Sequence, residues 1–497
     1  MENRQALLLE ITEEKNKDWA SVVRQCQDYA ECCGLLIRKR GSEGKCSTEM
    51  GSMMLFPSKY PRSVYEQALA VQQTYNLLYH KVAHDYEFMK ETLSSTFERD
   101  DFMRDLWKLY ETARSSESQP VSMEIMRSDY MYQVKDGCFK IAQIEMNTVA
   151  SSMAVLSEKV NQTHRYLDRV INKPKLIDSS KFPQHDTVSA LASGLVAAWE
   201  IYNNTSAVVL VVVETDEMNF SDIRNIEYEM LRQSNEVKVI VRSTEGLSSS
   251  AVSLSDGNHL SVNEHEVAVV YFRTYFNPEH YNQRDWALRL MIERSKAIKC
   301  PTVAAQIAGS KTIQQVLTQP GVLERFLSPE ECASLRDTFV AIYSLNKEAI
   351  EKVTEKPEDY VLKPNREGGG HNYYGQEILP KLKEIAATQE EEAYILMERV
   401  FPESQYNCRV AFDGAKATCS CILTVSELGM YGVIIGSASS VERNAASGYL
   451  LRTKSSNANE GGYYAGISAI DTPSLQDDKD MLDELANTRP CDDNCCS

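Results

Sequence analysis

A carboxylate and an amide stand two residues apart in the segment QIEMNT, at Glu145 and Asn147. On an extended strand, residues two apart point to the same face, so both side-chain oxygens can reach one hard cation such as Mg²⁺. Alternating polar residues also occur on the polar face of many ordinary strands. The pair therefore indicates a metal site only if other candidate binding residues support it.

A second candidate is the segment from Lys363 to Glu367 with the three glycines that follow it, Gly368 to Gly370. Successive glycines form a pliable backbone whose N–H groups can approach phosphate oxygens. A lysine before the glycines can neutralise phosphate charge, and the carboxylate can hold Mg²⁺. A plain surface loop would also be rich in glycine, but the flanking charges favour a nucleoside triphosphate.

Two later segments could complete such a site. The apolar run of residues 394–400 is interrupted by Glu398 and is otherwise typical of a core strand. Arg452 and Lys454 stand on one side of an extended segment, shortly before a flexible stretch at residues 458–462. Two cations beside a flexible loop suit a carboxylate and a phosphate, although a solvated basic edge has the same pattern.

These side chains need a mixed scaffold. Apolar residues at three-to-four spacing over residues 64–89 predict an amphipathic helix. Two β-like runs joined by the turn at residues 135–137 predict a hairpin. Helix-like and strand-like segments alternate over residues 188–270, which predicts a parallel sheet covered by helices. Ligands bind at the carboxyl ends of such strands, which here are Glu214 to Asn219 and Arg273.

Composition excludes several classes of protein. The 497 residues include 53 Lys+Arg and 71 Asp+Glu, a net charge of −18, which argues against nucleic-acid binding. No apolar run approaches the roughly 20 residues of a membrane helix. The amino terminus lacks a signal-peptide pattern, so we expect a cytoplasmic protein, although a secreted chain whose signal had been removed would look the same. Thirteen cysteines without a zinc-type pair predict reduced thiols.

A resemblance to a known family rests on eight segments in chain order, RSDYM, QIEMNT, VAVVYFR, GSK, VLKPNREGGG, YILME, SELG and LLRTK. They resemble the eukaryotic glutathione synthetases, which are ATP-grasp ligases, up to about Asp471. The resemblance implies an α/β ATP-grasp fold with a helical N-terminal scaffold, and a homodimer. Its parts would be a body (1–204 and 307–497), an inserted parallel α/β substrate-binding module (205–306) and a glycine-rich lid (about 335–425). From Asp471 the chain is acidic and contains two prolines, which predicts a loose tail.

The resemblance also implies an activity, the ATP-dependent joining of γ-glutamylcysteine to glycine through an acyl phosphate, with two Mg²⁺ ions. It implies Arg127 and Arg452 as catalytic residues and Glu145, Asn147 and Glu367 as metal ligands. ATP would contact Glu145, Lys311, Lys363, Gly368, Gly369, Gly370, Asn372, Tyr374, Met397, Glu398, Val400, Glu427, Lys454 and Glu460. The substrates would contact Arg127, Ser151, Ser152, Glu217, Met218, Asn219, Arg273, Arg452, Tyr463 and Tyr464.

Four positions depart from the pattern of that family. Ile223 stands where the family has Gln, Phe276 where it has Tyr, and Tyr463 and Tyr464 where it has two small residues. Aromatic rings need space, and each buried hydroxyl needs a partner. Three hypotheses follow: ordinary glutathione synthesis, a ligase with another amine acceptor or weak glutathione synthesis, and a non-catalytic ATP- or peptide-binding relative. The complete set of metal and phosphate residues favours an enzyme.

Overall fold

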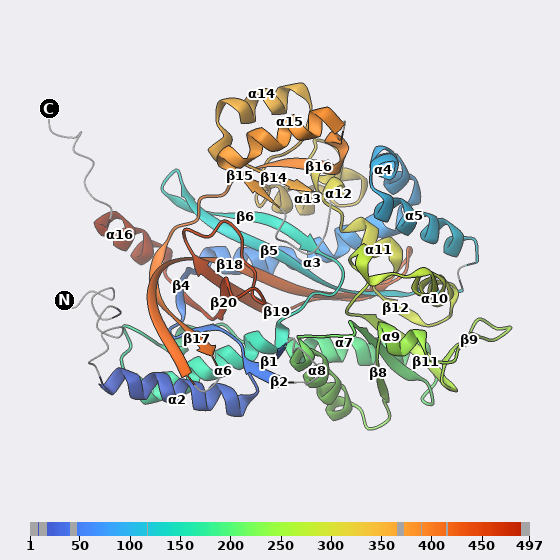
Figure 1. Cartoon of the computed structure of the whole chain (residues 1–497), viewed down its shortest axis with the longest axis horizontal. Helices are drawn as coiled ribbons and strands as arrows, with labels where there is room; N and C mark the ends of the chain where they lie inside the picture. The colour runs from blue at the N-terminus through green and yellow to red at the C-terminus, as the bar shows by residue number, and fades with distance from the viewer. Residues whose placement is uncertain are drawn as a thin grey trace.

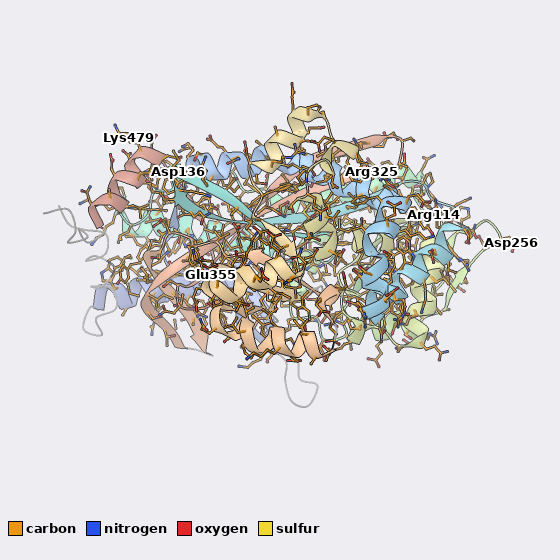
Figure 2. The ribbon with its side chains drawn as sticks, turned by 90° about the horizontal axis from the view of Figure 1, so that it is seen from above. Arg114, Asp136, Asp256, Arg325, Glu355 and Lys479 are labelled. Atoms are coloured by element: carbon orange, nitrogen blue, oxygen red, sulfur yellow. The ribbon has the colours of Figure 1, made fainter. Side chains whose placement is uncertain are left out.

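The computed structural model describes residues 8, 17–39, 47–116, 118–364, 372–388, 390–413 and 416–488. The fold is mixed α/β, as predicted, and its strands form three main sheets (Figure 1). The hairpin turn at Asp136 and the turn at Asp256 lie toward opposite ends of the long axis (Figure 2). In the described part of the chain, no helix is long and apolar enough to cross a membrane.

The central sheet has seven strands in the order β17-β3-β20-β19-β18-β5-β6. The strands are β3 (Met53–Met54), β5 (Ser122–Lys135), β6 (Cys138–Asn147), β17 (Gln405–Asp413), β18 (Lys416–Gly436), β19 (Val441–Ser455) and β20 (Ser468–Asp471). The predicted hairpin joins β5 to β6, and its turn residues Asp136 and Gly137 have φ of 54° and 72°. The long strand β18 pairs with β17, β19 and β5, and thereby links remote parts of the chain.

Side-chain alternation along β5 and β18 gives this sheet two buried faces. Met126 and Leu428 belong to one apolar core, whereas Ile125 and Val433 belong to the other. Helices α3 (Arg62–His84), α4 (Tyr86–Arg99), α5 (Asp101–Arg114), α11 (Val303–Ala308), α12 (Lys311–Leu317) and α13 (Pro329–Arg336) contribute to the first core. Helices α2 (Lys17–Cys33), α6 (Ala154–Ile171) and α7 (Thr187–Tyr202) contribute to the second.

The predicted parallel sheet is present, with β8-β7-β11-β12 all parallel. Its strands are β7 (Val208–Val213), β8 (Val239–Ser243), β11 (His265–Phe272) and β12 (Ile298–Cys300), and β9 (Val252–Leu254) and β10 (Leu260–Val262) extend it antiparallel. All six residues of β7 are buried, as a central parallel strand requires. The accompanying helices are α8 (Phe220–Gln233), α9 (Thr244–Ser248) and α10 (Gln283–Arg294).

A smaller antiparallel sheet, β13-β16-β14-β15, lies at the top of Figure 1 beneath α14 (Lys347–Glu355) and α15 (Ile378–Thr388). Its strands are β13 (Ile342–Ser344), β14 (Tyr360–Pro364), β15 (Tyr373–Tyr374) and β16 (Tyr394–Glu398). Leu362 and Leu396 pack with Ile378 and Val353 in a core separate from the two larger ones. The sheet therefore carries Lys363 on an independently packed element.

One expectation about chain organisation was wrong. The helix expected over residues 64–89 divides at Asp85, whose carboxylate accepts a hydrogen bond from Phe88 N at 3.0 Å and caps α4. Here a local capping interaction overrides the periodicity of the sequence.

The segment from Asp471 is also not a loose tail. Asp471 is buried and accepts hydrogen bonds from Ser58 Oγ at 2.6 Å and Thr453 Oγ1 at 2.8 Å. Strand β21 (Pro473–Gln476) then pairs in parallel with β4 (Ser58–Pro61), and α16 (Asp478–Thr488) follows. The acidic composition belongs to a helix rather than to an unstructured end. A two-stranded sheet of β1 (Leu36–Lys39) and β2 (Ser47–Met50) completes the strand set of the described residues.

Candidate active site

Polar side chains converge on one face of the central sheet. The neighbours Met126, Met146, Leu428 and Leu451 all lie in the core beneath α3, so the residues between them point to the opposite face. The pairing places Arg127 opposite Asn147, Asp129 opposite Glu145, and Glu427 opposite Arg452. Strand alternation and register alone thus gather Arg127, Asp129, Glu145, Asn147, Glu427 and Arg452.

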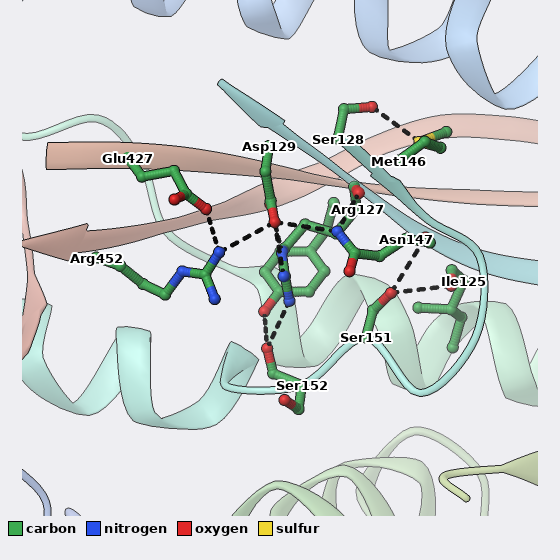
Figure 3. Close-up of polar contacts among 11 residues, drawn as sticks. Ile125, Arg127, Ser128, Asp129, Met146, Asn147, Ser151, Ser152, Glu427 and Arg452 are labelled. Atoms are coloured by element: carbon green, nitrogen blue, oxygen red, sulfur yellow. Dashed lines mark hydrogen bonds and ion pairs between the residues drawn. The ribbon is translucent and has the colours of Figure 1, made fainter. Parts of the chain in front are cut away.

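Asp129 is the centre of this group, and it is fully buried (Figure 3). Its carboxylate accepts from Arg127 Nε at 2.6 Å and Arg127 NH2 at 2.8 Å, a bidentate pair. It also accepts from Asn147 Nδ2 at 3.0 Å and Arg452 NH2 at 3.1 Å. Burial opposes ionisation of Asp129, but the charge and hydrogen bonds of Arg127 outweigh it and lower the pKa of this carboxyl.

The two predicted catalytic arginines are therefore parts of one network. Arg452 NH2 also donates to Glu427, and Arg127 NH1 donates to the carbonyl of Ser152 at 3.3 Å. Burial disfavours the charge on Arg452, but Glu427 and Asp129 raise its pKa. Both guanidinium groups stay charged, and the acids hold them in fixed positions.

Gly429 allows the bidentate pair to form. A Cβ atom at this position would lie 2.7 Å from Arg127 Cδ and 2.7 Å from Asp129 Oδ1. Gly429 stands directly opposite Asp129 on the adjacent strand β18. Any side chain there would push Arg127 and Asp129 apart, which gives a physical reason for glycine in the SELG segment.

The predicted phosphate lysines lie beside the network. Lys363 on β14 is only 6% exposed, and its Nζ donates to Ile144 O at 3.4 Å. Burial lowers the pKa of Lys363, the negative charge of Glu145 raises it, and the positive charge of Lys311 lowers it further. Lys311 is buried in the first turn of α12. The two cations and the candidate metal ligand Glu145 therefore share one electrostatic environment.

The segment that precedes Lys311 packs against the end of β6. A Cβ atom on Gly309 would lie 2.2 Å from Thr148 Oγ1, so only glycine permits this approach. Thr148 directly follows Asn147, which makes the contact a link between the GSK segment and the candidate metal ligands.

The loop at residues 457–462 contacts the smaller sheet. Asn372 N donates to Glu460 Oε1 at 2.8 Å, and Asn372 Nδ2 donates to the hydroxyl of Tyr374 at 3.4 Å. Lys454 Nζ donates to Asn459 O at 2.5 Å, and burial lowers the pKa of Lys454. Four residues predicted to contact ATP thus meet where β19 and β15 approach each other.

Three other predicted ATP contacts lie at the end of β16. Met397 is buried against Ile342 and Ile395, whereas Glu398 is exposed and accepts from Tyr343 OH at 2.9 Å. Val400 is half-buried just beyond the strand. Met397 lies on the face of the smaller sheet opposite its core, in a small cluster against which Ile144 of β6 packs.

The predicted peptide-binding residues form a second cluster. Arg273 directly follows β11, donates through NH1 to the carbonyl of Ser151, and lies 3.5 Å from Asp222 Oδ2. Asn219 Nδ2 donates to Asp222 Oδ2 at 2.8 Å, and Glu217 Oε1 accepts from Asn219 N at 2.7 Å. Burial raises the pKa of Glu217. This cluster lies at the carboxyl ends of parallel strands, as predicted.

Residues 148–153 join the two clusters. The carbonyl of Ser151 faces Arg273, and the carbonyl of Ser152 accepts from Arg127. Ala150 and Met153 have φ of 52° and 77°, values uncommon for residues other than glycine. The bent backbone turns successive carbonyls toward opposite arginines. The carbonyl of Met218 accepts a hydrogen bond from Arg38 N at 2.9 Å.

Three of the residues that depart from the family pattern, Ile223, Phe276 and Tyr463, take no part in the hydrogen bonds described above for the two clusters. Ile223 is buried in the core beneath α6 and α7, and Phe276 packs edge-to-face on His280 at 4.6 Å. Tyr463 is 5% exposed, and a Cβ atom on Gly51 would lie 1.9 Å from its hydroxyl. Tyr463 is therefore inserted into the protein above Gly51 and fixes the loop that carries it.

Tyr464 is different, because it is 36% exposed and stands at the tip of that loop. Its ring lies edge-to-face on Tyr463 at 5.4 Å. Burial raises the pKa of Tyr464, and the charges of Asp222, Glu217 and Arg273 also affect it. The hydroxyl of Tyr464 therefore shares an electrostatic environment with the peptide-binding cluster, whereas the side chain of Ile223 lies in the core.

Four predicted residues, Glu367, Gly368, Gly369 and Gly370, lie outside the described residues. Within the described ranges, no group of three His, Cys, Asp or Glu side chains is arranged to hold a metal ion. Of the two remaining candidate ligands, Asn147 has an amide orientation that fits one. Asn147 donates twice through Nδ2, to Asp129 and to the carbonyl of Arg127 at 3.1 Å, so its Oδ1 is held on the side away from these groups.

Comparison with known families gives an assignment. The family model described as the ATP-binding domain of eukaryotic glutathione synthase matches residues 16–475. The chain belongs to the eukaryotic glutathione synthase family. Glutathione synthetase of Macaca fascicularis is 39% identical over 464 residues, covering 91% of this chain and 96% of that protein. The Homo sapiens glutathione synthetase is 38% identical over 464 residues, with the same coverage.

Solved structures agree with the family assignment. A glutathione synthetase like-effector from Globodera pallida, in apo form, aligns with a TM-score of 0.75 and 26% sequence identity. The alignment covers 94% of this chain and 99% of that chain. The mixed α/β architecture of this glutathione synthase family member is therefore of the ATP-grasp type.

Sequence reasoning missed two acidic residues that organise the site. Asp129 was not predicted, although it stands two residues after Arg127 on one strand and so shares its face. Asp222 was also missed, although it stands in the first turn of α8. It accepts from Val155 N at 2.9 Å and thereby anchors the start of α6. Both acids could have been found by asking which carboxylates face the predicted arginines.

Proposed function

We propose that this protein is a glutathione synthetase that ligates γ-glutamylcysteine and glycine, with conversion of ATP to ADP and phosphate. The observation that carries the proposal is the network in which Asp129 and Glu427 hold Arg127 and Arg452 beside Lys363, Lys311 and Glu145. Membership of the family over residues 16–475 supplies the substrate class.

The reaction requires activation of a carboxylate, which is a poor electrophile. The cysteinyl carboxylate attacks the γ-phosphorus of ATP, the bond to the bridging oxygen breaks, and ADP leaves. The glycine amine then attacks the acyl phosphate carbon, loses a proton and displaces inorganic phosphate. Neither step needs a nucleophile from the protein, so positioning and charge neutralisation are the protein's contributions.

The chain's own residues supply both contributions. Lys363 and Lys311 bring positive charge to the triphosphate from a buried position, where charge interactions are stronger than in water. Arg452 and Arg127, held by Asp129, face the carboxylate that becomes activated. Arg273 and Asn219 would bind the acidic dipeptide at the adjacent cluster. Exclusion of water by the glycine-rich segment would protect the acyl phosphate from hydrolysis.

Mg²⁺ is part of this proposal, with Glu145 and Asn147 as ligands from β6 and Glu367 as a further one. The orientation of the Asn147 amide and the position of Glu145 beside Lys363 support this choice. Bound Mg²⁺ would neutralise phosphate oxygens and align the triphosphate. The residues would hold up to two ions together with ATP, as the family resemblance implies.

The proposal is tested by measuring phosphate release from purified protein with Mg²⁺, ATP and γ-glutamylcysteine, before and after glycine is added. We expect glycine to stimulate release and the tripeptide to form in equal amount. Release without stimulation by glycine, together with activity on another amine, would establish the alternative ligase. Failure to bind ATP in a titration would contradict the ligase and favour a non-catalytic peptide-binding relative.

Tyr464 is expected to restrict the amine acceptor. The charges of Glu217 and Arg273 act on its hydroxyl, and we expect its ring to take up space that an acceptor side chain would need. Tyr464→Ala should reduce the preference for glycine over alanine by about tenfold, the effect of one methyl group in a tight pocket. Specificity constants for both amines measure this ratio. Tyr228→Ala on the exposed surface of α8 serves as the control, and an unchanged ratio in Tyr464→Ala would exclude this role.

Three properties of the family extend the proposal. We infer a homodimer, which sedimentation of the purified protein can test. We infer a cytoplasmic location, and the nine described cysteines are free, as expected in a reducing compartment. The division into a body (1–204 and 307–497), an inserted module (205–306) and a lid (about 335–425) is likewise a proposal. It is supported by the parallel sheet of β7, β8, β11 and β12 and by the independently packed sheet of β13 to β16.

A further inference from the structure

Three cysteines gather on one face of the β17–β18 hairpin, away from the candidate active site. Cys408 on β17 is fully buried, and Cys419 and Cys421 on β18 are half-buried. Cys26 on α2 lies on the same side, in the core that Cys419 and Cys421 pack against. No step of the proposed ligation uses any of these thiols.

The strand register places one pair directly opposite. Cys408 pairs with Cys421, whereas Cys419 pairs with Val410 and lies diagonal to Cys408. The carbonyl of Cys408 accepts from Leu55 N at 2.7 Å, so the backbone polar groups of Cys408 point toward β3 and away from β18. Cys408 and Cys421 are therefore a pair without mutual backbone hydrogen bonds.

In antiparallel sheets, residue pairs without mutual backbone hydrogen bonds lie closer together than hydrogen-bonded pairs. The Cα atoms of such a pair lie about 4.5 Å apart and its side chains point to the same face. Disulfides span Cα separations of about 4.4–6.8 Å, so the pair meets the distance requirement without movement of either strand. The diagonal neighbour Cys419 is farther away, at about 7–8 Å between Cα atoms, the usual diagonal spacing.

The two thiols also differ in accessibility. Hydrogen bonds with Cys419 and Cys421, followed by burial, raise the pKa of Cys408. The Cys408 thiol also donates to Leu8 O at 3.7 Å, which keeps it in the protonated form. Cys421 is partly open to solvent. An external reagent would therefore meet Cys421 first.

We propose that Cys421 and Cys408 are a thiol pair that undergoes disulfide exchange with a small-molecule disulfide such as oxidised glutathione. The thiolate of Cys421 attacks one sulfur of the reagent, its S–S bond breaks, and one glutathione thiolate leaves and takes up a proton. Cys408 then loses its proton to solvent and attacks the sulfur of Cys421, which releases the second glutathione. The two cysteines are oxidised by two electrons, and oxidised glutathione is reduced to two thiols.

The product would be a covalent link between β17 and β18, upstream of Glu427 on the same strand. The choice of oxidised glutathione as reagent rests on the proposed function, because it is the oxidised form of the proposed product. The sulfur chemistry itself does not depend on ligase activity. The two proposals can therefore fail separately.

The test uses the full-length protein with graded ratios of oxidised to reduced glutathione, followed by blocking of remaining thiols and peptide mapping by mass spectrometry. We expect a linked Cys408–Cys421 peptide, a loss of two hydrogen atoms from the intact protein, and full reversal by dithiothreitol. Cys408→Ser should instead retain one glutathione on Cys421, because the second thiol is missing.

The control variant is Cys419→Ser, which should form the link as wild type does. The exposed thiols Cys32 and Cys138 report whether the reagent is active. Glutathione adducts on these two, without a Cys408–Cys421 link in wild type, would overturn the proposal. A link that survives Cys421→Ser but is lost in Cys419→Ser would overturn the assigned pair.

Discussion

Lys363→Met is expected to lower the rate of ligation by about a thousandfold, the scale seen when one preorganised charge contact is removed from an active site. The methionine keeps the length and apolar stem of the side chain, so the core of the smaller sheet is retained. What disappears is the buried cation beside Glu145 and Lys311. Without it, the triphosphate would meet an excess of carboxylates on this side of the site.

The measurement is glycine-dependent phosphate release at saturating and limiting ATP, together with ATP affinity by titration. The matched control is Lys352→Met on α14, beside the same sheet but in an exposed ion pair with Glu348. The control should retain wild-type activity. If Lys363→Met retains it too, the triphosphate does not bind where we place it.

The pH dependence gives an independent check on Lys363. Burial lowers its pKa from the ordinary value of 10.5, so the protonated form needed for phosphate binding is lost at a lower pH than for an exposed lysine. Activity should therefore fall on the alkaline side earlier than usual. Lys363→Arg, whose charge persists, should shift this fall to higher pH if it retains activity.

Asp129→Asn is expected to have the largest effect on the arginine network. It leaves the buried Arg127 without its charge partner, and removing one member of a buried ion pair costs about 3–5 kcal/mol of stability. It also frees Arg452 from one of its two acidic contacts. We therefore expect both a lower melting temperature and a lower kcat, since Asp129 positions both arginines without touching the reacting atoms.

Thermal unfolding and steady-state kinetics measure the two effects separately. Asp105→Asn, which disrupts an exposed pair with Lys108, should change stability by less than about 1 kcal/mol. Rescue of kcat in Asp129→Glu, with the charge restored, would support a positioning role. An unchanged melting temperature and kcat in Asp129→Asn would show that the network is dispensable.

Local pattern predicted much of this fold. The strand at residues 360–364 appears as β14, and the turn at residues 135–137 closes the hairpin. These succeed because turn chemistry and strand periodicity are properties of short segments. The break at Asp85 was missed, because a capping side chain competes with a periodicity that continues across it. The structured segment after Asp471 was missed because its partner, β4, lies about 400 residues away in the chain.

In the candidate site, too, features within one segment were predicted and features that depend on strand order were not. Glu145 and Asn147 were predicted from spacing within one strand, and the structure places both on the shared face. The engagement of Arg127 and Arg452 by Asp129 depends on the order of β6, β5, β18 and β19, which no single segment encodes. Ile223 and Tyr464 both depart from the family pattern, and the sequence alone does not distinguish their roles. In the structure, Ile223 is buried in the core, whereas charges of the peptide-binding cluster act on Tyr464.

The central claim is that this protein activates the cysteinyl carboxylate as an acyl phosphate before glycine attacks. Its most direct test uses γ-glutamylcysteine whose cysteinyl carboxylate carries heavy oxygen, with ATP, Mg²⁺ and glycine. We expect one labelled oxygen in the released phosphate for each tripeptide formed. Tripeptide formation with unlabelled phosphate, or labelled phosphate without any tripeptide, would contradict it.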